Sequence, residues 1–201
     1  MPRTPHRPRR IGVFGGTFDP PHLAHLVVAV EVRDALDLDV VLLVVANDPW
    51  QKTDTRCITP AAVRLEMVRA AVADEPGLEA SDLEIVRGGP SYSVDTMEEL
   101  RRRHPDAELY LVLGADAAAG LDTWHRHRDL LALCELVVVG RPGTVPSLPE
   151  GTSAVQVEVP QLEVSASDLR ARVAAGRSIR YLVPDPVISL IREHRLYGGP
   201  R

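Results

Sequence analysis

The chain has 201 residues, of which 45% are hydrophobic, so it is long enough for one well-packed domain and its length gives no reason to expect two. Its formal net charge of −5 argues against a general binder of nucleic acid or of membrane surfaces, because such proteins usually carry a basic balance. Cys57 and Cys134 are isolated in the sequence, which argues against a disulfide framework or a zinc site and fits a reducing cytoplasm.

The first nine residues are basic and rich in proline. The apolar run that follows them is broken by Gly15 and Asp19, so no signal-peptide core forms. No apolar stretch approaches the length that spans a bilayer. We therefore expect a flexible tail at 1–9 and a single domain at 10–201, located in the cytoplasm.

Apolar runs rich in β-branched residues alternate with helical patterns along the chain. This alternation with short connections predicts a doubly wound, mostly parallel α/β sheet that is covered on both faces. Ligands of such sheets bind beyond the carboxyl ends of the strands. In chain order we expect a strand at 11–14, a helix at 23–36, a strand at 40–46, helices at 60–73 and 93–103, strands at 109–113, 136–139 and 155–159, and helices at 167–175 and 187–193.

The segment GGTFDPPHLAHL leads from the first predicted strand into the first predicted helix. His22 and His25 are spaced i and i+3, so they share one helix face and can address the same anion. N–H groups and the dipole at a helix start also attract phosphate. A Gly-Gly turn and a histidine pair are each common, but their combination after Pro20 and Pro21 favours a nucleotide-phosphate site. The absence of GxGxxG disfavours a hydride-transfer enzyme.

Two loops after predicted strands carry further polar groups. The first holds Asn47 and Lys52, and the lysine could reach a phosphate as a mobile charge. The second begins with Gly114, and the carboxylate of Asp116 could accept hydrogen bonds from ribose or cap a helix. Trp124 lies just beyond and either packs in the core or offers its ring to a flat heterocycle.

A second helix start lies late in the chain, in the segment VSASDLR. Ser165 and Asp168 match the S-x-x-[DE] signal for a helix start, which explains part of the pattern without a ligand. Capping alone does not require Arg170, so we expect a second anion site here. Two helix-start phosphate sites predict a polyphosphate held along its length.

Together these segments resemble those of bacterial nicotinate-nucleotide adenylyltransferases. The resemblance rests on the histidine motif, the loop ending PWQK, the segment RGGPSYSVDT, the LGAD after a strand and the late VSASDLR, and it runs from about residue 10 to residue 197. The PWQK form resembles the actinobacterial branch. The histidine motif alone would indicate only the wider HxGH nucleotidyltransferase superfamily, which includes phosphopantetheine adenylyltransferase and several cytidylyltransferases.

The resemblance implies a Rossmann-like nucleotidyltransferase fold and transfer of AMP from ATP to nicotinate mononucleotide, which gives deamido-NAD and pyrophosphate. It implies Mg²⁺ with ATP as co-substrate, no dedicated metal ligands in the protein, no nucleic-acid or membrane partner, and a homo-oligomer as one option. In-line attack without a covalent intermediate agrees with the sequence, which shows no activated nucleophile beside a base.

The resemblance also assigns roles to individual residues. The reacting phosphates would contact His22 and His25. The ATP site would contain Gly15, Thr17, Phe18, Lys52, Gly114, Asp116, Arg141, Ser165, Ser167 and Arg170. The acceptor would contact Asn47, Ser93, Trp124 and His125.

Three positions depart from the family's usual pattern: Ala24 replaces a glycine between the histidines, Ala166 replaces a serine, and Asp48 adds a carboxylate near phosphates. These departures keep two alternatives open. One is a sister enzyme that acts on nicotinamide mononucleotide or another phosphorylated acceptor. The other is a non-catalytic nucleotide-binding paralogue, which the presence of both histidines, Lys52 and Arg170 argues against.

Overall fold

The computed structural model describes residues 7–49, 58–141, 143 and 145–198. Within them lies a six-stranded sheet of order β3-β2-β1-β4-β5-β6, and every pair of neighbouring strands is parallel. The strands are β1 (Arg10–Gly16), β2 (Val40–Val45), β3 (Leu78–Ser81), β4 (Glu108–Gly114), β5 (Glu135–Gly140) and β6 (Val155–Glu158).

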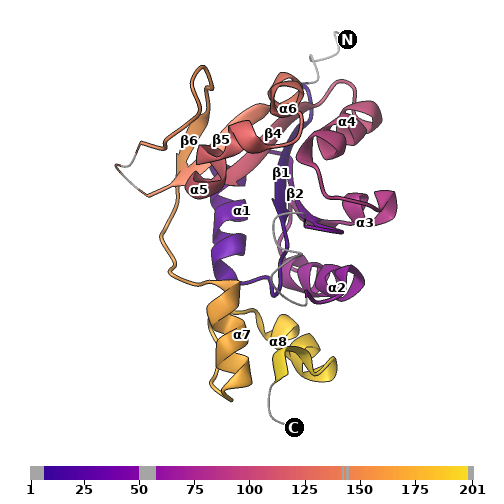
Figure 1. Ribbon diagram of the computed structural model, residues 1–201, viewed down its shortest axis with the longest axis vertical. Coiled ribbons are helices and arrows are strands. Elements are labelled where there is room, and N and C mark those ends of the chain that lie inside the picture. Colours follow the sequence, from indigo (N-terminus) through magenta and orange to yellow (C-terminus); the bar gives the residue numbers. More distant parts are fainter. Residues whose placement is uncertain (1–6, 50–57, 142, 144, 199–201) are drawn as a thin grey trace, which may run out of the picture.

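Helices connect the strands and complete the chain (Figure 1). The α-helices are α1 (Leu23–Ala35), α2 (Ala61–Val72), α3 (Leu83–Arg87), α4 (Ser93–Arg103), α5 (Ala115–Ala119), α6 (His127–Leu133), α7 (Ala166–Ala174) and α8 (Asp185–Glu193), and two 3-10 turns are η1 (Leu121–Thr123) and η2 (Leu196–Gly198).

Both faces of the sheet are buried, which explains why the central strands are continuous apolar runs rather than alternating ones. In β2, Val44 packs in one core cluster with Met97 of α4 and Leu130 of α6. Its neighbour Leu43 points to the other face and belongs to the cluster that contains Val32 of α1. Helices α1 and α2 thus cover one face, and α4 and α6 cover the other.

The direction of the crossovers changes between β1 and β4, which are adjacent in the sheet but far apart in the sequence. Chains that diverge to opposite faces leave a crevice beyond the carboxyl ends of such a strand pair, and ligands bind there. The loops after β1 and β4, which include the histidine motif, lie at this crevice.

Helices α7 and α8 form a separate layer next to the start of α1 (Figure 1). Their apolar residues pack in a third cluster that includes Val187 of α8 and Met67 of α2. The layer therefore rests on α2, and its own first turns lie near the carboxyl end of the sheet. None of the helices in the described ranges is both long and apolar enough to cross a membrane.

The expected α/β architecture and all ten expected elements are present, with ends that differ by at most a few residues. The expectation missed β3, α3, α5 and α6. Strand β3 has four residues, in which apolar and polar side chains alternate, and α3 and α5 have five residues each. Segments this short carry too little periodicity to be recognised, and tertiary packing stabilises them. Of the expected tail, Arg7 is described and forms an ion pair with Asp39.

Candidate active site

Two histidine rings stack at the N-terminal end of α1. The ring centroids of His22 and His25 lie 3.7 Å apart with an interplanar angle of 25°. His22 precedes the helix, and its backbone N–H donates to Nδ1 of His25 at 3.2 Å. Because Nδ1 accepts this hydrogen bond, the ring proton of His25 is assigned to Nε2, which makes Nε2 the donor of this ring.

The side chain of His22 is buried, with 5% of its surface exposed. Its Nδ1 has no hydrogen-bond partner among the described residues. Burial lowers the pKa of His22 to about 4, because the charged imidazolium is poorly solvated there. The ring is therefore neutral at pH 7, and it retains a buried polar atom that a ligand could satisfy.

The first N–H groups of α1 are less available to an anion than the sequence predicts. The N–H of Leu23 donates to the carbonyl of Leu182 at 3.0 Å, and the N–H of His25 donates to the carbonyl of His22 at 2.9 Å. The protein itself thus satisfies several donors that a helix start usually leaves open. An anion here would depend more on the imidazole rings than on the backbone.

Two glycines end β1, and Phe18 follows them in the turn that leads to α1. Phe18 is buried, has a φ of 50° in the left-handed region, and packs its ring 5.0 Å from that of His25. A Cβ on Gly16 would lie 2.8 Å from the Phe18 ring, whereas a Cβ on Gly15 would meet no atom within 4 Å. Packing therefore requires glycine at position 16, while Gly15 borders open space in which a ligand could approach the backbone.

A buried arginine holds the loops after β1 and β2 together. Arg64 of α2 is 1% exposed, and its guanidinium donates to the carbonyl oxygens of Thr59 at 2.7 Å and Thr17 at 2.8 Å. A third hydrogen bond runs to the carbonyl oxygen of Asn47 at 3.3 Å. The sequence analysis missed this residue, although a cation on the apolar face of a predicted helix was a signal that could have found it.

The loop after β2 is joined to the segment that precedes α4. The side-chain amide of Asn47 donates to the carbonyl of Gly89 at 2.9 Å. The N–H of Ser91 donates to the carbonyl of Asp48 at 3.0 Å, and the N–H of Asp48 donates to Oγ of Ser91 at 3.3 Å. Asn47 therefore has a structural partner, and its contact with substrate stays a prediction. Lys52 lies outside the described residues.

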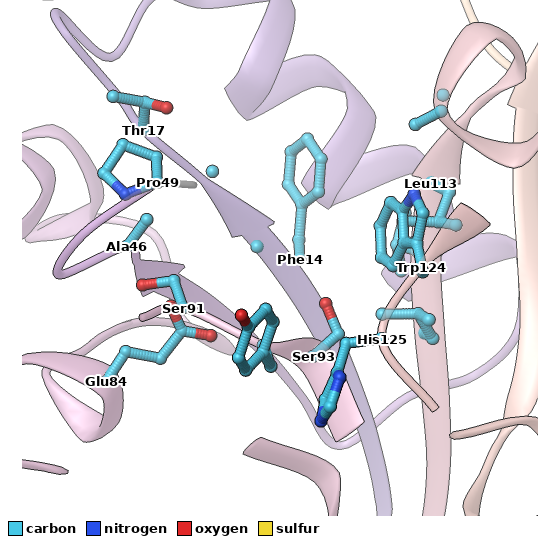
Figure 2. A pocket seen from close by; sticks show the side chains of 17 residues that line it. Phe14, Thr17, Ala46, Pro49, Glu84, Ser91, Ser93, Leu113, Trp124 and His125 are labelled. Carbon is cyan, nitrogen blue, oxygen red and sulfur yellow. The ribbon is translucent and has the colours of Figure 1, made fainter. Parts of the chain in front are cut away.

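A cavity of about 280 Å³ opens at the crevice between β1 and β4. Figure 2 shows Glu84 and Ser91 on one side of it and Trp124 on the other, with Phe14 between them. Its walls come from the loops after β1, β2 and β4, from α3 and from the start of α4. The predicted site residues that line it are Gly15, Thr17, Ser93, Gly114, Trp124 and His125.

Aromatic rings form one wall of this cavity. Tyr92 stacks on His125, with the ring centroids 4.4 Å apart and an interplanar angle of 30°. Trp124 is half-buried, packs against the core and lines the cavity as well. Trp124 therefore packs against the core, as one alternative expects, and its stacking on a flat heterocycle stays a prediction.

A line of polar groups lies behind the opposite wall. Glu84 is buried, and its carboxylate accepts a hydrogen bond from Oγ1 of Thr96 at 2.7 Å. Nη1 of Arg87 donates to the same Oγ1 at 3.2 Å. These contacts tie α3 to the first turns of α4, which carries Ser93 into the cavity.

The second predicted anion site lies beside the first. Ser165 caps α7, and its Oγ accepts the N–H of Asp168 at 3.1 Å, which confirms the predicted start signal. Oγ of Ser167 is 3.2 Å from Oγ of Ser165. Nη1 of Arg170 donates to the carbonyl of Asp19 at 2.8 Å, which brings the first turns of α7 next to the segment that leads into α1. The two helix starts therefore lie next to each other, and their joint contact with a polyphosphate stays a prediction.

The remaining predicted residues are exposed. Asp116 lies in the first turn of α5, which Gly114 rather than Asp116 caps. Arg141 directly follows β5. Both lie beyond the carboxyl ends of strands, so their contacts with adenosine stay predictions. Among the described residues, no three His, Cys, Asp or Glu side chains gather into a metal-binding group.

Comparisons of the amino-acid sequence show the family of this chain. Residues 13–172 match the cytidylyltransferase-like family. A relative from Exiguobacterium sibiricum, named a probable nicotinate-nucleotide adenylyltransferase, is 47% identical over 189 residues that cover 94% of this chain and 99% of the relative. The chain belongs to the nicotinate-nucleotide adenylyltransferases. A second relative of the same name, from the actinobacterium Corynebacterium kroppenstedtii, is 45% identical and is covered over 90% of its length, with 94% of this chain.

Solved structures agree with this membership at the level of the fold. The nicotinic acid mononucleotide adenylyltransferase of Plasmodium falciparum, in complex with NaAD, has a TM-score of 0.78 at 18% identity and covers 96% of this chain, with 98% of its own. Nicotinate-nucleotide adenylyltransferases are enzymes of NAD biosynthesis, which confirms the predicted class. The expected resemblance and the nucleotidyltransferase fold are confirmed as well.

Proposed function

We propose that this chain transfers the adenylyl group of ATP to nicotinate mononucleotide, releasing pyrophosphate and forming deamido-NAD. The observation that carries the proposal is the stacked pair His22 and His25 beside the cavity between β1 and β4. Relatives that are 42–47% identical over most of the chain carry the name of this activity. The Plasmodium falciparum enzyme has been solved in complex with NaAD and in complex with APC.

The proposed reaction needs positioning and charge stabilisation rather than a protein nucleophile. A phosphate oxygen of nicotinate mononucleotide attacks the α-phosphorus of ATP, and the bond from that phosphorus to the bridging oxygen of pyrophosphate breaks. Nε2 of His25 donates to an oxygen on which negative charge develops. The first turns of α1 and α7 hold the polyphosphate between them, with Ser165 and Ser167 as hydroxyl donors.

The acceptor occupies the 280 Å³ cavity in this proposal. Trp124 offers a flat ring there, and the start of α4 at Ser93 offers N–H groups and a positive dipole end to a carboxylate. A carboxylate on the pyridine ring would gain from this helix start, whereas a neutral carboxamide would gain less. This difference favours nicotinate mononucleotide over nicotinamide mononucleotide.

We expect Mg²⁺ to accompany ATP in this reaction. Mg²⁺ keeps several waters and binds through one or two carboxylates and the substrate's phosphates rather than in a cage of protein ligands. When bound, the ion would neutralise negative charge on the phosphates, and the histidines would provide hydrogen-bond donors of fixed direction.

An acceptor screen tests the proposal. Pyrophosphate release is measured with ATP and Mg²⁺ and with nicotinate mononucleotide, nicotinamide mononucleotide or phosphopantetheine as the acceptor. We expect release with nicotinate mononucleotide and at least tenfold lower kcat/KM with the others. Absence of pyrophosphate release with nicotinate mononucleotide overturns the proposal. A higher kcat/KM with another acceptor would show that nicotinate mononucleotide is not the substrate.

A further inference from the structure

Asp19 is a buried carboxylate inside the histidine motif that the proposed chemistry does not use. It is 2% exposed and lies three residues before His22. Its Oδ1 accepts a hydrogen bond from the hydroxyl of Tyr197 at 2.7 Å, and its Oδ2 lies 3.5 Å from the N–H of Thr59. A buried carboxylate is costly unless such donors satisfy it, so these contacts determine where the Asp19 side chain lies.

Tyr197 reaches this site from the far end of the described chain, in η2. Burial and the adjacent charge of Asp19 raise the pKa of Tyr197 above its ordinary value, so the hydroxyl keeps its proton and donates at neutral pH. The backbone of Tyr197 has a φ of 64°, and Phe18, which precedes Asp19, has a φ of 50°. Both residues are held in a conformation that side chains rarely adopt, which persists only where the surroundings enforce it.

Within the described residues, hydrogen bonds join the α7–α8 layer to the start of α1. Tyr197 binds the carboxylate of Asp19, Arg170 binds the carbonyl of Asp19 at 2.8 Å, and the carbonyl of Leu182 accepts the N–H of Leu23 at 3.0 Å. They bracket the histidine motif on both sides of His22. Only the bond from Tyr197 ends on a side chain with a formal charge, and a charge-assisted hydrogen bond is the stronger kind.

We propose that Tyr197 is a positioning residue for adenylyl transfer: its hydroxyl fixes Asp19 and thereby sets the histidine motif against the first turns of α7. The inference rests on the proposed function and deepens it. Without the hydroxyl, Asp19 loses a 2.7 Å hydrogen bond, and the spacing between the two phosphate-facing turns is held less firmly. Small errors of this kind in the placement of reacting groups lower the rate strongly.

The first test replaces Tyr197 by phenylalanine, which keeps the ring and removes the hydroxyl. The matched control is Tyr181→Phe, because Tyr181 also has a positive φ, of 65°, but is 80% exposed. We expect Tyr197→Phe to remain folded by circular dichroism and to lose at least tenfold in kcat, with the KM for nicotinate mononucleotide within twofold of the original. Tyr181→Phe should keep its kcat. An unchanged kcat in Tyr197→Phe overturns the proposal.

A double-mutant cycle tests whether the hydroxyl acts through Asp19. If it does, Asp19→Asn combined with Tyr197→Phe should be about as slow as Asp19→Asn alone. Losses in kcat that multiply would show that Tyr197 acts independently of Asp19, and the proposal would be wrong.

A binding measurement separates this proposal from the proposed function. The affinity for α,β-methylene-ATP, measured by calorimetry, needs no turnover, and we expect Tyr197→Phe to weaken it at least fivefold while Tyr181→Phe does not. Suppose that the unaltered protein releases no pyrophosphate but that Tyr197→Phe binds α,β-methylene-ATP more weakly than Tyr181→Phe does. The proposed function then fails and the positioning role stands. If the affinity also is unchanged in that case, both fail.

Discussion

The backbone N–H of His22 donates to Nδ1 of His25, and this hydrogen bond assigns the proton of the neutral His25 ring to Nε2. Nε2 then carries the proton and is fixed in direction by the stacking of the two rings. A donor that is preorganised in this way costs no reorientation when negative charge develops on the transferred phosphate.

Replacing His25 by alanine should therefore lower kcat by about 100- to 1000-fold, which corresponds to the ~2.7–4 kcal/mol typical of one lost donor at an oxyanion site. Pyrophosphate release at saturating ATP and nicotinate mononucleotide measures the effect. His104→Ala, at the C-terminal end of α4, is the matched control and should keep its rate. A loss below tenfold in His25→Ala would remove His25 from the chemistry.

Stability should depend on pH through His22. The pKa of His22 is lowered to about 4 in the folded protein, against about 6.5 when unfolded, so between these values the unfolded chain binds a proton that the folded chain does not. The contribution of His22 to the free energy of unfolding should be complete above pH 6.5. It should decrease as the pH falls toward 4, by up to about 3 kcal/mol.

Urea unfolding at pH 7 and pH 4.5, for the unaltered protein and for His22→Asn, measures this contribution. The asparagine variant lacks the titrating ring, so its stability should fall less between the two pH values. An equal decrease in both proteins would contradict the assignment.

The two glycines of the first turn should respond oppositely to a methyl group. Gly16→Ala places Cβ 2.8 Å from the ring of Phe18 and should destabilise the fold by roughly 1–3 kcal/mol, as overpacking does. Gly15→Ala meets no protein atom and should leave the melting temperature within about 2 °C, because small surface changes usually cost little. Since Gly15 lines the cavity, its variant should instead raise KM severalfold. Thermal unfolding and steady-state kinetics on both variants separate the two effects.

Arg64 should be worth more to stability than other arginines of α2. Arg64→Met leaves the carbonyl oxygens of Thr17, Asn47 and Thr59 without their shared donor, and the expected cost is about 3 kcal/mol. Arg69→Met serves as the control, because the Arg69 side chain is 59% exposed and pairs only at the surface with Asp82. Similar unfolding free energies for the two variants would show that the buried guanidinium does not hold these loops.

The sequence predicts the part of the site that lies close together along the chain. His22 and His25 belong to one helix start, and Ser165 and Asp168 to another, so periodicity and capping rules suffice to recognise them. The strand-to-helix alternation likewise predicts the sheet, because parallel strands need crossover helices.

The contacts that assemble the site span long stretches of chain and leave no local pattern. Tyr197 meets Asp19 across 178 residues, and Arg64 reaches the carbonyl of Thr17 across 47. Tyr197 is not unusual at its position until the fold brings Asp19 near, and a cation on an apolar helix face marks Arg64 without identifying its partners. The hydrogen bond from the N–H of Leu23, the first residue of α1, to the carbonyl of Leu182 could not be predicted for the same reason.

The strand order has a consequence for how such an enzyme changes over generations. In the proposed function, the phosphates contact the turn after β1 and α7, whereas much of the cavity wall proposed for the acceptor comes from the segments at 84–93 and 117–125. Because these two sets occupy separate stretches of the gene, mutations can accumulate in the acceptor walls while the histidines are inherited intact. Enzymes that differ in acceptor should therefore differ first in these two segments, with β1 and its histidine turn as their shared ancestry.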